Sequence, residues 1–416
     1  MKNSLSLAFV LVLLGCTQIE SKDWPEFRGP GGQGISTATG LPVHWSAKEN
    51  VTWKKPIPGK AWSSPIILKG RIYMTTAVPT DDGDAGPQVL RVLALDVTSG
   101  DTLWDTEVFR HGPTSVHQKN SHASPTPLTD GRFLFVHFGT NGTACLDLEG
   151  NLVWRNNKLL YDPRHGSGGS PAFISDRALG ISCDGLDKQF FVALDRQSGK
   201  ILWKTDRPPH SGRGFSFTTP LLIEVDGRKQ VVSPGSDHVC SYDVESGKEI
   251  WRVNYPGGYS VVPRPLYAHG LVFVCSGWGT PWVYAIRPDG KGDVTESHVA
   301  WKKKEGAPRS PAPLIVGKEI YTITDKGVAT CRDAVTGKVH WRGRIGGNHS
   351  AAPLYAEGRI YFQSEEGEGV VITAGTEFEE LARNPIGERT LASYAVDDGV
   401  LFIRSLDHLY RIEEKG

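Results

Sequence analysis

The stretch LALDVTSGDTLW, residues 93–104, decides the fold because close variants of it recur along the chain. In each copy an Asp opens a turn, and a glycine stands four residues before a closing tryptophan. The other copies are CLDLEGNLVW (145–154), VALDRQSGKILW (192–203), CSYDVESGKEIW (240–251) and CRDAVTGKVHW (331–341). Asp hydrogen-bonds local backbone and glycine accepts a positive φ angle, so both residues favour a tight turn. We therefore interpret the recurring Asp residues as structural.

A ladder of tryptophans extends this repeat over most of the chain. Trp53, Trp104, Trp154, Trp203, Trp251, Trp301 and Trp341 follow one another at intervals of 51, 50, 49, 48, 50 and 40 residues. A period of this length indicates propeller blades or a solenoid. Apolar and polar residues alternate in IILKGRIYMTT (66–76) and FLFVHFGT (133–140), which is typical of half-buried strands. Four such strands in each unit favour the blade of a β-propeller.

Eight units can be counted, opening at residues 63, 124, 170, 218, 264, 312, 352 and 392. The last unit ends after three strands, whereas VTWKKPI (51–57) is an orphan strand in front of the first unit. We therefore predict an all-β, eight-bladed β-propeller of four-stranded blades over residues 49–416, closed by the N-terminal strand, which completes the last blade. Insertions at 79–87 and 109–122 are expected to project from the ring as loops.

The N-terminus, MKNSLSLAFVLVLLGC (1–16), carries an apolar run that is too short for a permanent membrane span. We interpret residues 1–15 as an export signal. LLGC resembles a bacterial lipobox, which implies lipidation of Cys16 and leaves residues 16–48 as a leader or tether. The protein is thus expected to be a periplasmic or cell-envelope lipoprotein that contacts the membrane only through its lipid. If Cys16 is not lipidated, we expect secretion.

Composition excludes several classes of function. Lys plus Arg and Asp plus Glu are 46 each, so no bulk charge favours binding to nucleic acid. The other five cysteines are widely spaced inside expected strands, and no Cys/His spacing suggests a metal site. GPGGQG (29–34) lacks the preceding strand and the Lys of a phosphate loop, so we interpret it as part of a flexible leader.

The Asp, Gly and Trp phrase resembles the PQQ-like (pyrroloquinoline quinone) propeller repeat, and the resemblance covers residues 49 to 412. That family includes quinoprotein dehydrogenases, BamB-type lipoproteins of outer-membrane assembly, and exported propellers without an assigned role. The leader DWPEFRGPGGQGIS (23–36) looks like the opening of the last group. The resemblance therefore implies the fold far more specifically than it implies a function.

Two functions remain open on this resemblance. A quinoprotein dehydrogenase would hold PQQ with Ca²⁺ at the channel mouth, usually above an adjacent pair of cysteines, but this chain has no adjacent cysteines and no large insertions. We favour a non-catalytic scaffold at the cell envelope, a monomeric ring without cofactor or metal that binds an envelope protein or a small acidic ligand. A PQQ-dependent alcohol or sugar dehydrogenase is the alternative.

Candidate site residues lie in the loops that enter the innermost strands, because these loops point into the channel mouth of a propeller. Most of these loops hold a basic or titratable residue, and several contain no Asp or Glu. A ring of positive potential would hold a carboxylate, a phosphate or an acidic peptide, whereas the alternative is a set of unrelated solvated loops. The candidates, with Trp62 as a stacking or packing residue, are Lys60, Trp62, His122, His165, Arg213, Arg264, Arg309, His349 and Arg389.

Overall fold

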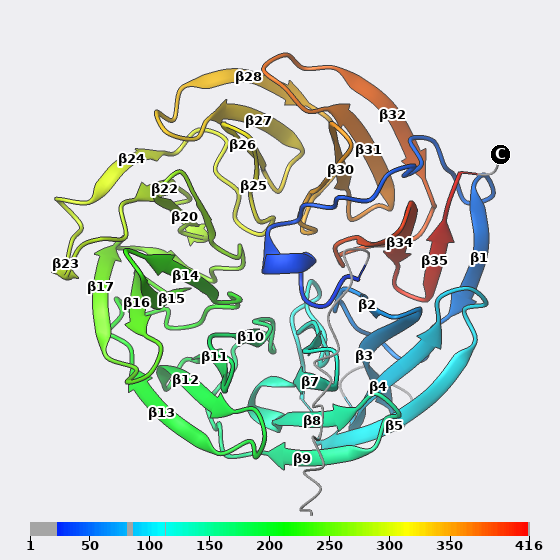
Figure 1. Ribbon diagram of the computed structural model, residues 1–416, viewed down its shortest axis with the longest axis horizontal. Coiled ribbons are helices and arrows are strands. Elements are labelled where there is room, and N and C mark those ends of the chain that lie inside the picture. The colour runs from blue at the N-terminus through cyan, green and yellow to red at the C-terminus, as the bar shows by residue number, and fades with distance from the viewer. Residues whose placement is uncertain (1–22, 81–85, 113, 415–416) are drawn as a thin grey trace, which may run out of the picture.

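The computed structural model describes residues 23–80, 86–112 and 114–414, and it confirms the all-β, eight-bladed propeller. Eight antiparallel sheets surround a central axis (Figure 1). In order from the axis to the rim, the blades are β2–β5 (Ile66–Leu68, Arg71–Pro79, Gln88–Asp96, Thr102–His111), β6–β9 (Leu128–Thr129, Phe133–His137, Thr143–Asp147, Leu152–Asn156), β10–β13 (Ala172–Phe173, Ala178–Asp184, Gln189–Asp195, Ile201–Asp206), β14–β17 (Leu221–Val225, Arg228–Pro234, His238–Asp243, Glu249–Asn254), β19, β20, β22 and β24 (Leu266–Ala268, Leu271–Cys275, Val283–Ile286, Val299–Lys303), β25–β28 (Leu314–Val316, Glu319–Ile323, Val328–Asp333, Val339–Arg344), β29–β32 (Leu354–Ala356, Arg359–Gln363, Glu368–Thr373, Glu380–Pro385), and β33–β35 with β1 (Ala395–Asp397, Val400–Arg404, His408–Ile412, Val51–Pro56). We number these blades one to eight.

Three short strands and two 3₁₀ turns complete the secondary structure of the described residues. They are β18 (Gly258–Tyr259), β21 (Trp278–Gly279), β23 (Gly292–Asp293), η1 (Pro30–Gly32) and η2 (Gly139–Asn141). No helix in this part of the chain is long and apolar enough to cross a membrane.

The eighth blade combines both ends of the propeller. Strand β1 pairs with β35 in antiparallel register, from Val51 opposite Ile412 to Pro56 opposite His408. Trp53 therefore occupies the rim strand, as the other ladder tryptophans do in their own blades. Because the first and last strands share one sheet, the ring is held by backbone hydrogen bonds where it would otherwise be open.

At most positions around the ring, the recurring Asp, Gly and Trp motif joins one blade to the next. The Asp96 carboxylate accepts the N–H groups of Thr98 (2.9 Å) and Ser99 (2.8 Å), which closes the turn before Gly100. The indole N–H of the preceding blade's tryptophan donates to a carbonyl near the turn, as from Trp104 to Leu148 (3.0 Å) and from Trp154 to Arg196 (2.9 Å). Fully burying an indole stabilises a fold by about 2 to 3 kcal/mol.

The turn glycine is required for the same contact. Gly150 has a φ of 87°, and a Cβ atom there would lie 2.7 Å from the Trp104 ring. A Cβ on Gly199 would lie 2.4 Å from the ring of Trp154. The glycine therefore serves both the turn and the indole that covers it.

The fifth blade lacks the Asp, Gly and Trp motif, so the tryptophan of the fourth blade has a different hydrogen-bond partner. Trp251 donates to the Gln230 side chain of its own blade (2.7 Å) and is fully buried. The long turn of the fifth blade folds back as β23, which adds a fifth, parallel strand beside β17.

The five cysteines among the described residues are all free and buried, so they are packing residues, while Cys16 lies outside the described residues.

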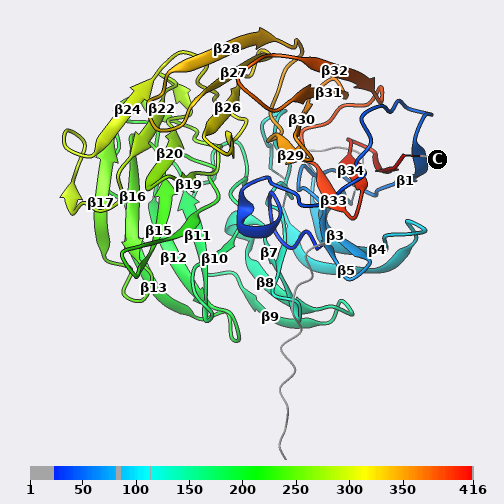
Figure 2. The same ribbon diagram turned by 45° about the horizontal axis from the view of Figure 1, so that its top comes forward.

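The leader is not flexible over its described part, which corrects our expectation for GPGGQG. Trp24 exchanges two backbone hydrogen bonds with Ile67 (2.8 Å each), and Arg28 donates to the Pro313 carbonyl (2.7 Å). The blue leader in Figures 1 and 2 starts at the centre of the ring and runs outward to β1. Near the rim, Trp45 is 2% exposed and its ring centroid lies 6.3 Å from that of Tyr361. Buried Trp and Arg side chains hold the segment, because leaving them in water would forfeit these contacts.

Replacement of Trp45 by Ala tests whether the leader is part of the folded ring. We expect Trp45→Ala to lower the free energy of unfolding by about 3 to 5 kcal/mol, because it opens a cavity against the seventh and eighth blades. Urea denaturation followed by circular dichroism measures the change. Thr37→Ala, an exposed change in the same segment, should stay within about 0.5 kcal/mol. Equal effects of the two changes would contradict this packing.

Two buried histidines make the stability depend on pH. Burial lowers the pKa of His137 in β7 to about 4, and burial together with the nearby Arg207 lowers the pKa of His238 in β16 to about 3. In the unfolded chain both histidines titrate near pH 6.5. Below that pH the unfolded state binds more protons than the folded state, so the free energy of unfolding decreases on acidification, by roughly 1.4 kcal/mol per pH unit for each histidine.

His137→Gln removes one of these groups, and we expect the pH slope between about pH 4.5 and 6 to decrease by roughly 1.4 kcal/mol per unit. Urea denaturation at several pH values gives the slope independently of any uniform loss of stability. The exposed His44→Gln is the matched control. An unchanged slope in His137→Gln would contradict the neutral, buried state of this ring.

Candidate functional site

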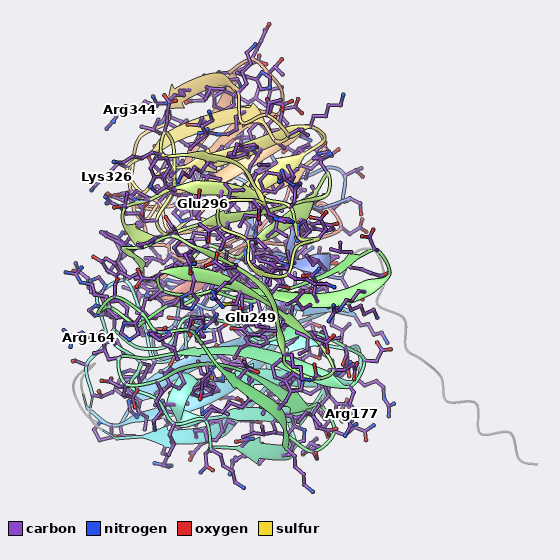
Figure 3. All side chains as sticks on the ribbon, turned by 90° about the vertical axis from the view of Figure 1, so that its left-hand side faces the viewer. Arg164, Arg177, Glu249, Glu296, Lys326 and Arg344 are labelled. Atoms are coloured by element: carbon purple, nitrogen blue, oxygen red, sulfur yellow. The ribbon has the colours of Figure 1, made fainter. Side chains whose placement is uncertain are left out.

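A cup of about 490 Å³ lies at the channel mouth, where the loops that enter the innermost strands converge. We call this side of the ring the mouth face; it carries, for example, residues 157–171 and 207–220. Figure 3 shows the ring edge-on, with Arg164, Lys326 and Arg344 along the mouth face and Arg177 at the opposite side. The cup is therefore assembled from loops that are far apart in the sequence.

Hydroxyl groups form the lower wall of the cup. Five of them stand at the same place in their blades, directly before the innermost strand, and all are at least nine-tenths buried. Each accepts a backbone N–H from the preceding blade: Ser64 N to Thr126 Oγ1 (2.9 Å), Thr126 N to Ser170 Oγ (2.9 Å), Ser170 N to Thr219 Oγ1 (3.0 Å), Ala352 N to Ser393 Oγ (2.9 Å) and Ser393 N to Ser64 Oγ (3.1 Å). None of the five donates its own proton to another of the described residues. They therefore remain donors toward the cup.

The leader interrupts this chain of hydroxyls and closes the channel below it. The fifth blade has Arg264 in the equivalent position, and its guanidinium donates to the Phe27 carbonyl (2.8 Å) and to the Glu26 carboxylate (2.9 Å). The Phe27 side chain lines the cup. The channel axis is thus filled by the leader, and the cup opens only toward the mouth face.

Aromatic rings form the upper wall. Trp62, Phe215, Phe217, Tyr259 and Trp278 line the cup. Strands β18 and β21 pair as a short ribbon that places Tyr259 directly opposite Trp278. The ring of Phe215 is inclined by 73° to that of Tyr259 and by 52° to that of Phe217. The wall therefore presents several ring faces at steep angles to one another.

Three arginines cover the outer side of this wall. The Arg213 guanidinium lies 4.5 Å from the ring centre of Tyr259 and donates to its hydroxyl, and Arg309 lies 4.7 Å from the ring of Trp278. Arg389 lies 5.6 Å from the ring of Trp62 and donates to the Gln118 carbonyl (3.1 Å). Cation–π contacts of this kind fix a guanidinium while its N–H edge stays available. Within the described part of the chain, none of the three forms an ion pair with a carboxylate.

Carboxylates are absent from the described residues that line the cup. Glu365 lies beside the cup, where it forms an ion pair with the lining residue Lys119 (2.6 Å) and accepts from the Ser350 hydroxyl (2.6 Å). Lys119 belongs to the inserted segment 109–122, so this loop is tied across the mouth to the seventh blade instead of projecting freely from the ring. The ion pair compensates the charge of Lys119, whereas Arg213, Arg309 and Arg389 have no carboxylate partner among the described residues.

The structure brings five of the nine candidate residues to the cup. Trp62 and His165 line it, and Arg213, Arg309 and Arg389 lie on its aromatic wall. The ring of His165 is 5.2 Å from that of Phe215, and burial with nearby His117 and Arg164 lowers its pKa. These residues come from five different blades or their connecting loops, as the mouth hypothesis requires.

The other four candidates lie elsewhere. Lys60 forms a backbone bridge with Ala77, and Arg264 binds the leader. His122 lies beside His111 (ring centres 4.9 Å apart) in a neighbouring pocket of about 480 Å³. The ring nitrogens of His349 are hydrogen-bonded to the carbonyls of Gln363 (3.1 Å) and Gly346 (2.8 Å). In a loop of six residues, tertiary packing decides which side chain faces the axis.

Several cup residues were missed by reasoning from the sequence. Phe215, Tyr259 and Trp278 stand in the Gly-rich segments GFSF (214–217), GGYS (257–260) and SGWG (276–279). Aromatic residues between glycines near a channel mouth are a signal that could have indicated the wall. The hydroxyl positions were visible in the unit openings, but their shared direction depends on the closed ring.

Comparison with known proteins agrees with this architecture. The family model described as outer membrane protein assembly factor BamB matches residues 33–180, 188–291 and 280–377. The BamB of Burkholderia pseudomallei is 22% identical over 283 residues, which are 66% of this chain and 64% of that protein. A lanthanide-dependent methanol dehydrogenase of Methylorubrum extorquens is 29% identical over 152 residues, 33% of this chain and 24% of that protein. The chain thus spans between a quarter and two thirds of the length of these relatives.

A solved structure shows the same fold at greater sequence distance. The quinohemoprotein alcohol dehydrogenase from Comamonas testosteroni superposes with a TM-score of 0.67 and 11% identity, covering 95% of this chain and 82% of that one. Because the BamB family model matches well over half of the chain, the protein belongs to the PQQ-like propeller family described by outer membrane protein assembly factor BamB.

Proposed function

We propose that this protein is an exported, non-catalytic binding module of the cell envelope, and that the cup at the mouth face is its ligand site. The observation that carries the proposal is the chemistry of the cup, in which hydroxyl donors and aromatic rings surround a cavity closed below by the leader. Three arginines without a carboxylate partner among the described residues pack on those aromatic rings. Such a site suits reversible capture of an acidic ligand, either a small molecule or part of an envelope protein.

Location is part of the proposal. The apolar N-terminal run and LLGC are consistent with export and lipidation of Cys16, although residues 1–22 lie outside the described part of the structure. A relative named outer membrane protein assembly factor supports a place at the envelope. We propose a monomeric ring tethered by its lipid, with a protein partner or an acidic small ligand at the mouth.

A quinone-dependent dehydrogenase is the second candidate, because relatives with that activity share the fold. Their metal-dependent chemistry needs a cation, and hard cations require carboxylate or amide oxygens as ligands. No Asp or Glu is among the described residues that line the cup; its amides are Gln118 and Asn120, and the Asn120 Oδ1 already accepts the Ser121 N–H (2.8 Å). The described residues contain no cluster of three or more His, Cys, Asp or Glu with metal-binding geometry. The five described cysteines lie in five separate blades. These residues do not fit a metal-bound PQQ.

A titration with PQQ separates the two candidates. We expect no binding of PQQ at micromolar concentrations with Ca²⁺ or a lanthanide present, and no dye-linked oxidation of alcohols or sugars. Isothermal titration calorimetry and the visible spectrum of the quinone provide the two measurements, and an apo quinoprotein dehydrogenase reconstituted in parallel is the positive control. Tight binding together with turnover would overturn the proposed function.

A further inference from the structure

We infer that the ligand of the cup is an anionic saccharide, with a uronic acid residue as the unit that enters it. This inference deepens the proposed function and rests on it, since it takes the cup as the ligand site. Three observations support it independently: the hydrogen-bond donors of the cup, the angles between the rings of the aromatic wall, and the lack of carboxylate partners for the arginines among the described residues.

The cup offers hydrogen-bond donors but no carboxylate acceptor among the described residues that line it. The hydroxyls of Ser64, Thr126 and Ser170 already accept a backbone N–H, so each has its proton left to donate. Ser310, which is buried and also lines the cup, forms no side-chain hydrogen bond with the described residues. Because carboxylates are absent from the lining, a ligand rich in acceptor oxygens matches these donors.

The donor excess favours a saccharide over an acidic peptide. Each residue of a peptide other than proline brings a backbone N–H that only donates, and the described lining residues offer no carboxylate to receive it. A sugar hydroxyl both accepts and donates, so it pairs with a donor wall without leaving a buried group unsatisfied. An acidic peptide therefore matches this lining less well than a saccharide does, because a buried N–H without an acceptor costs free energy.

The aromatic wall has the shape for a ring with a C–H face and not for a flat aromatic ligand. Phe215 is inclined by 73° to Tyr259 and by 85° to the imidazole of His165. Rings at such angles offer no pair of parallel faces between which a planar group could be inserted. A pyranose ring presents axial C–H groups on its face and polar groups at its edge, so it can pack on one ring face while its hydroxyls point to the serines.

The positive charges of Arg213 and Arg309 are the reason to expect a negatively charged ligand. Arg213 and Arg309 are held against aromatic faces and lack carboxylate partners among the described residues, so their N–H edges are available for a planar carboxylate. Desolvation of a guanidinium by an aromatic ring increases the benefit of such a pair. A neutral sugar would leave this charge without a partner, so selectivity for an acidic sugar follows.

Calorimetric titration of the full-length protein with trigalacturonate tests the inference, with neutral galactotriose as the matched ligand. We expect trigalacturonate to bind at least about ten-fold more tightly than galactotriose, and its affinity to decrease as salt rises. Arg213→Gln with Arg309→Gln should weaken trigalacturonate by about ten-fold or more. Arg132→Gln, an exposed arginine on a turn away from the cup, should leave the affinity unchanged.

Stacking and hydroxyl contacts are tested by Trp278→Ala and Ser310→Ala, and circular dichroism confirms that each variant folds. We expect both changes to weaken trigalacturonate while the melting temperature stays near that of the parent protein, because neither side chain forms a hydrogen bond within the described fold. Displacement of trigalacturonate by galacturonate monomer would place the acidic unit itself in the cup.

Three results would overturn the inference: no binding of trigalacturonate at millimolar concentration, equal affinity for galactotriose, or preference for a Glu-rich peptide over trigalacturonate. Each of these leaves the proposed function standing, because a different acidic ligand could still occupy the cup. The proposed function fails only if PQQ binds and supports turnover, so the two failures are distinguishable.

Discussion

The ring depends on one repeated interaction, in which the tryptophan of a blade lies over the turn of the next; within the described residues it occurs at six of the eight blades. The indole N–H of Trp104 donates to the Leu148 carbonyl, and the ring of Trp104 covers Gly150 so closely that any side chain there would collide with it. Each such contact sets the distance and angle between two neighbouring blades. Because the eighth blade contains both β35 and β1, the accumulated rotation must close. The period of the tryptophans in the sequence is therefore the period of the ring.

Closure of the ring creates the site, although none of the ladder residues belongs to it. With the blades fixed, the loops entering the innermost strands meet at one end of the channel, and hydroxyls such as Ser64 and Thr126 bridge neighbouring blades below the cup. The leader also forms part of the cup. Arg28 and Arg264 anchor it across the axis, so that Phe27 becomes part of the cup and the channel ends there. A propeller without this segment would have an open channel in place of a closed cavity.

Which candidate side chains lie at the cup could be predicted from the sequence only in part, for a physical reason. Arg213, Arg309 and Arg389 were identified because a loop before an innermost strand must run past the mouth, and long side chains there reach the rim. The same rule selected His349, which instead turns inward to bond the carbonyls of Gly346 and Gln363. The leader was expected to be flexible, because GPGGQG lacks a preceding strand and the Lys of a phosphate loop. Single buried residues such as Trp24 and Trp45 hold that segment, and a periodic pattern does not reveal them.

The sequence by itself determined the all-β class, the eight blades and the positions of the turns, because each of these follows from local spacing that repeats. Asp, Gly and Trp at fixed offsets carry the same meaning in every unit, whatever surrounds them. Only the tertiary structure decided which side chains face the cup, since residues from all eight blades and the leader approach each other there after the ring has closed. The direction of a side chain at the mouth, and the residues that it meets across the axis, depend on the rotation from each blade to the next, added up around the whole ring. No local stretch of sequence contains that total rotation.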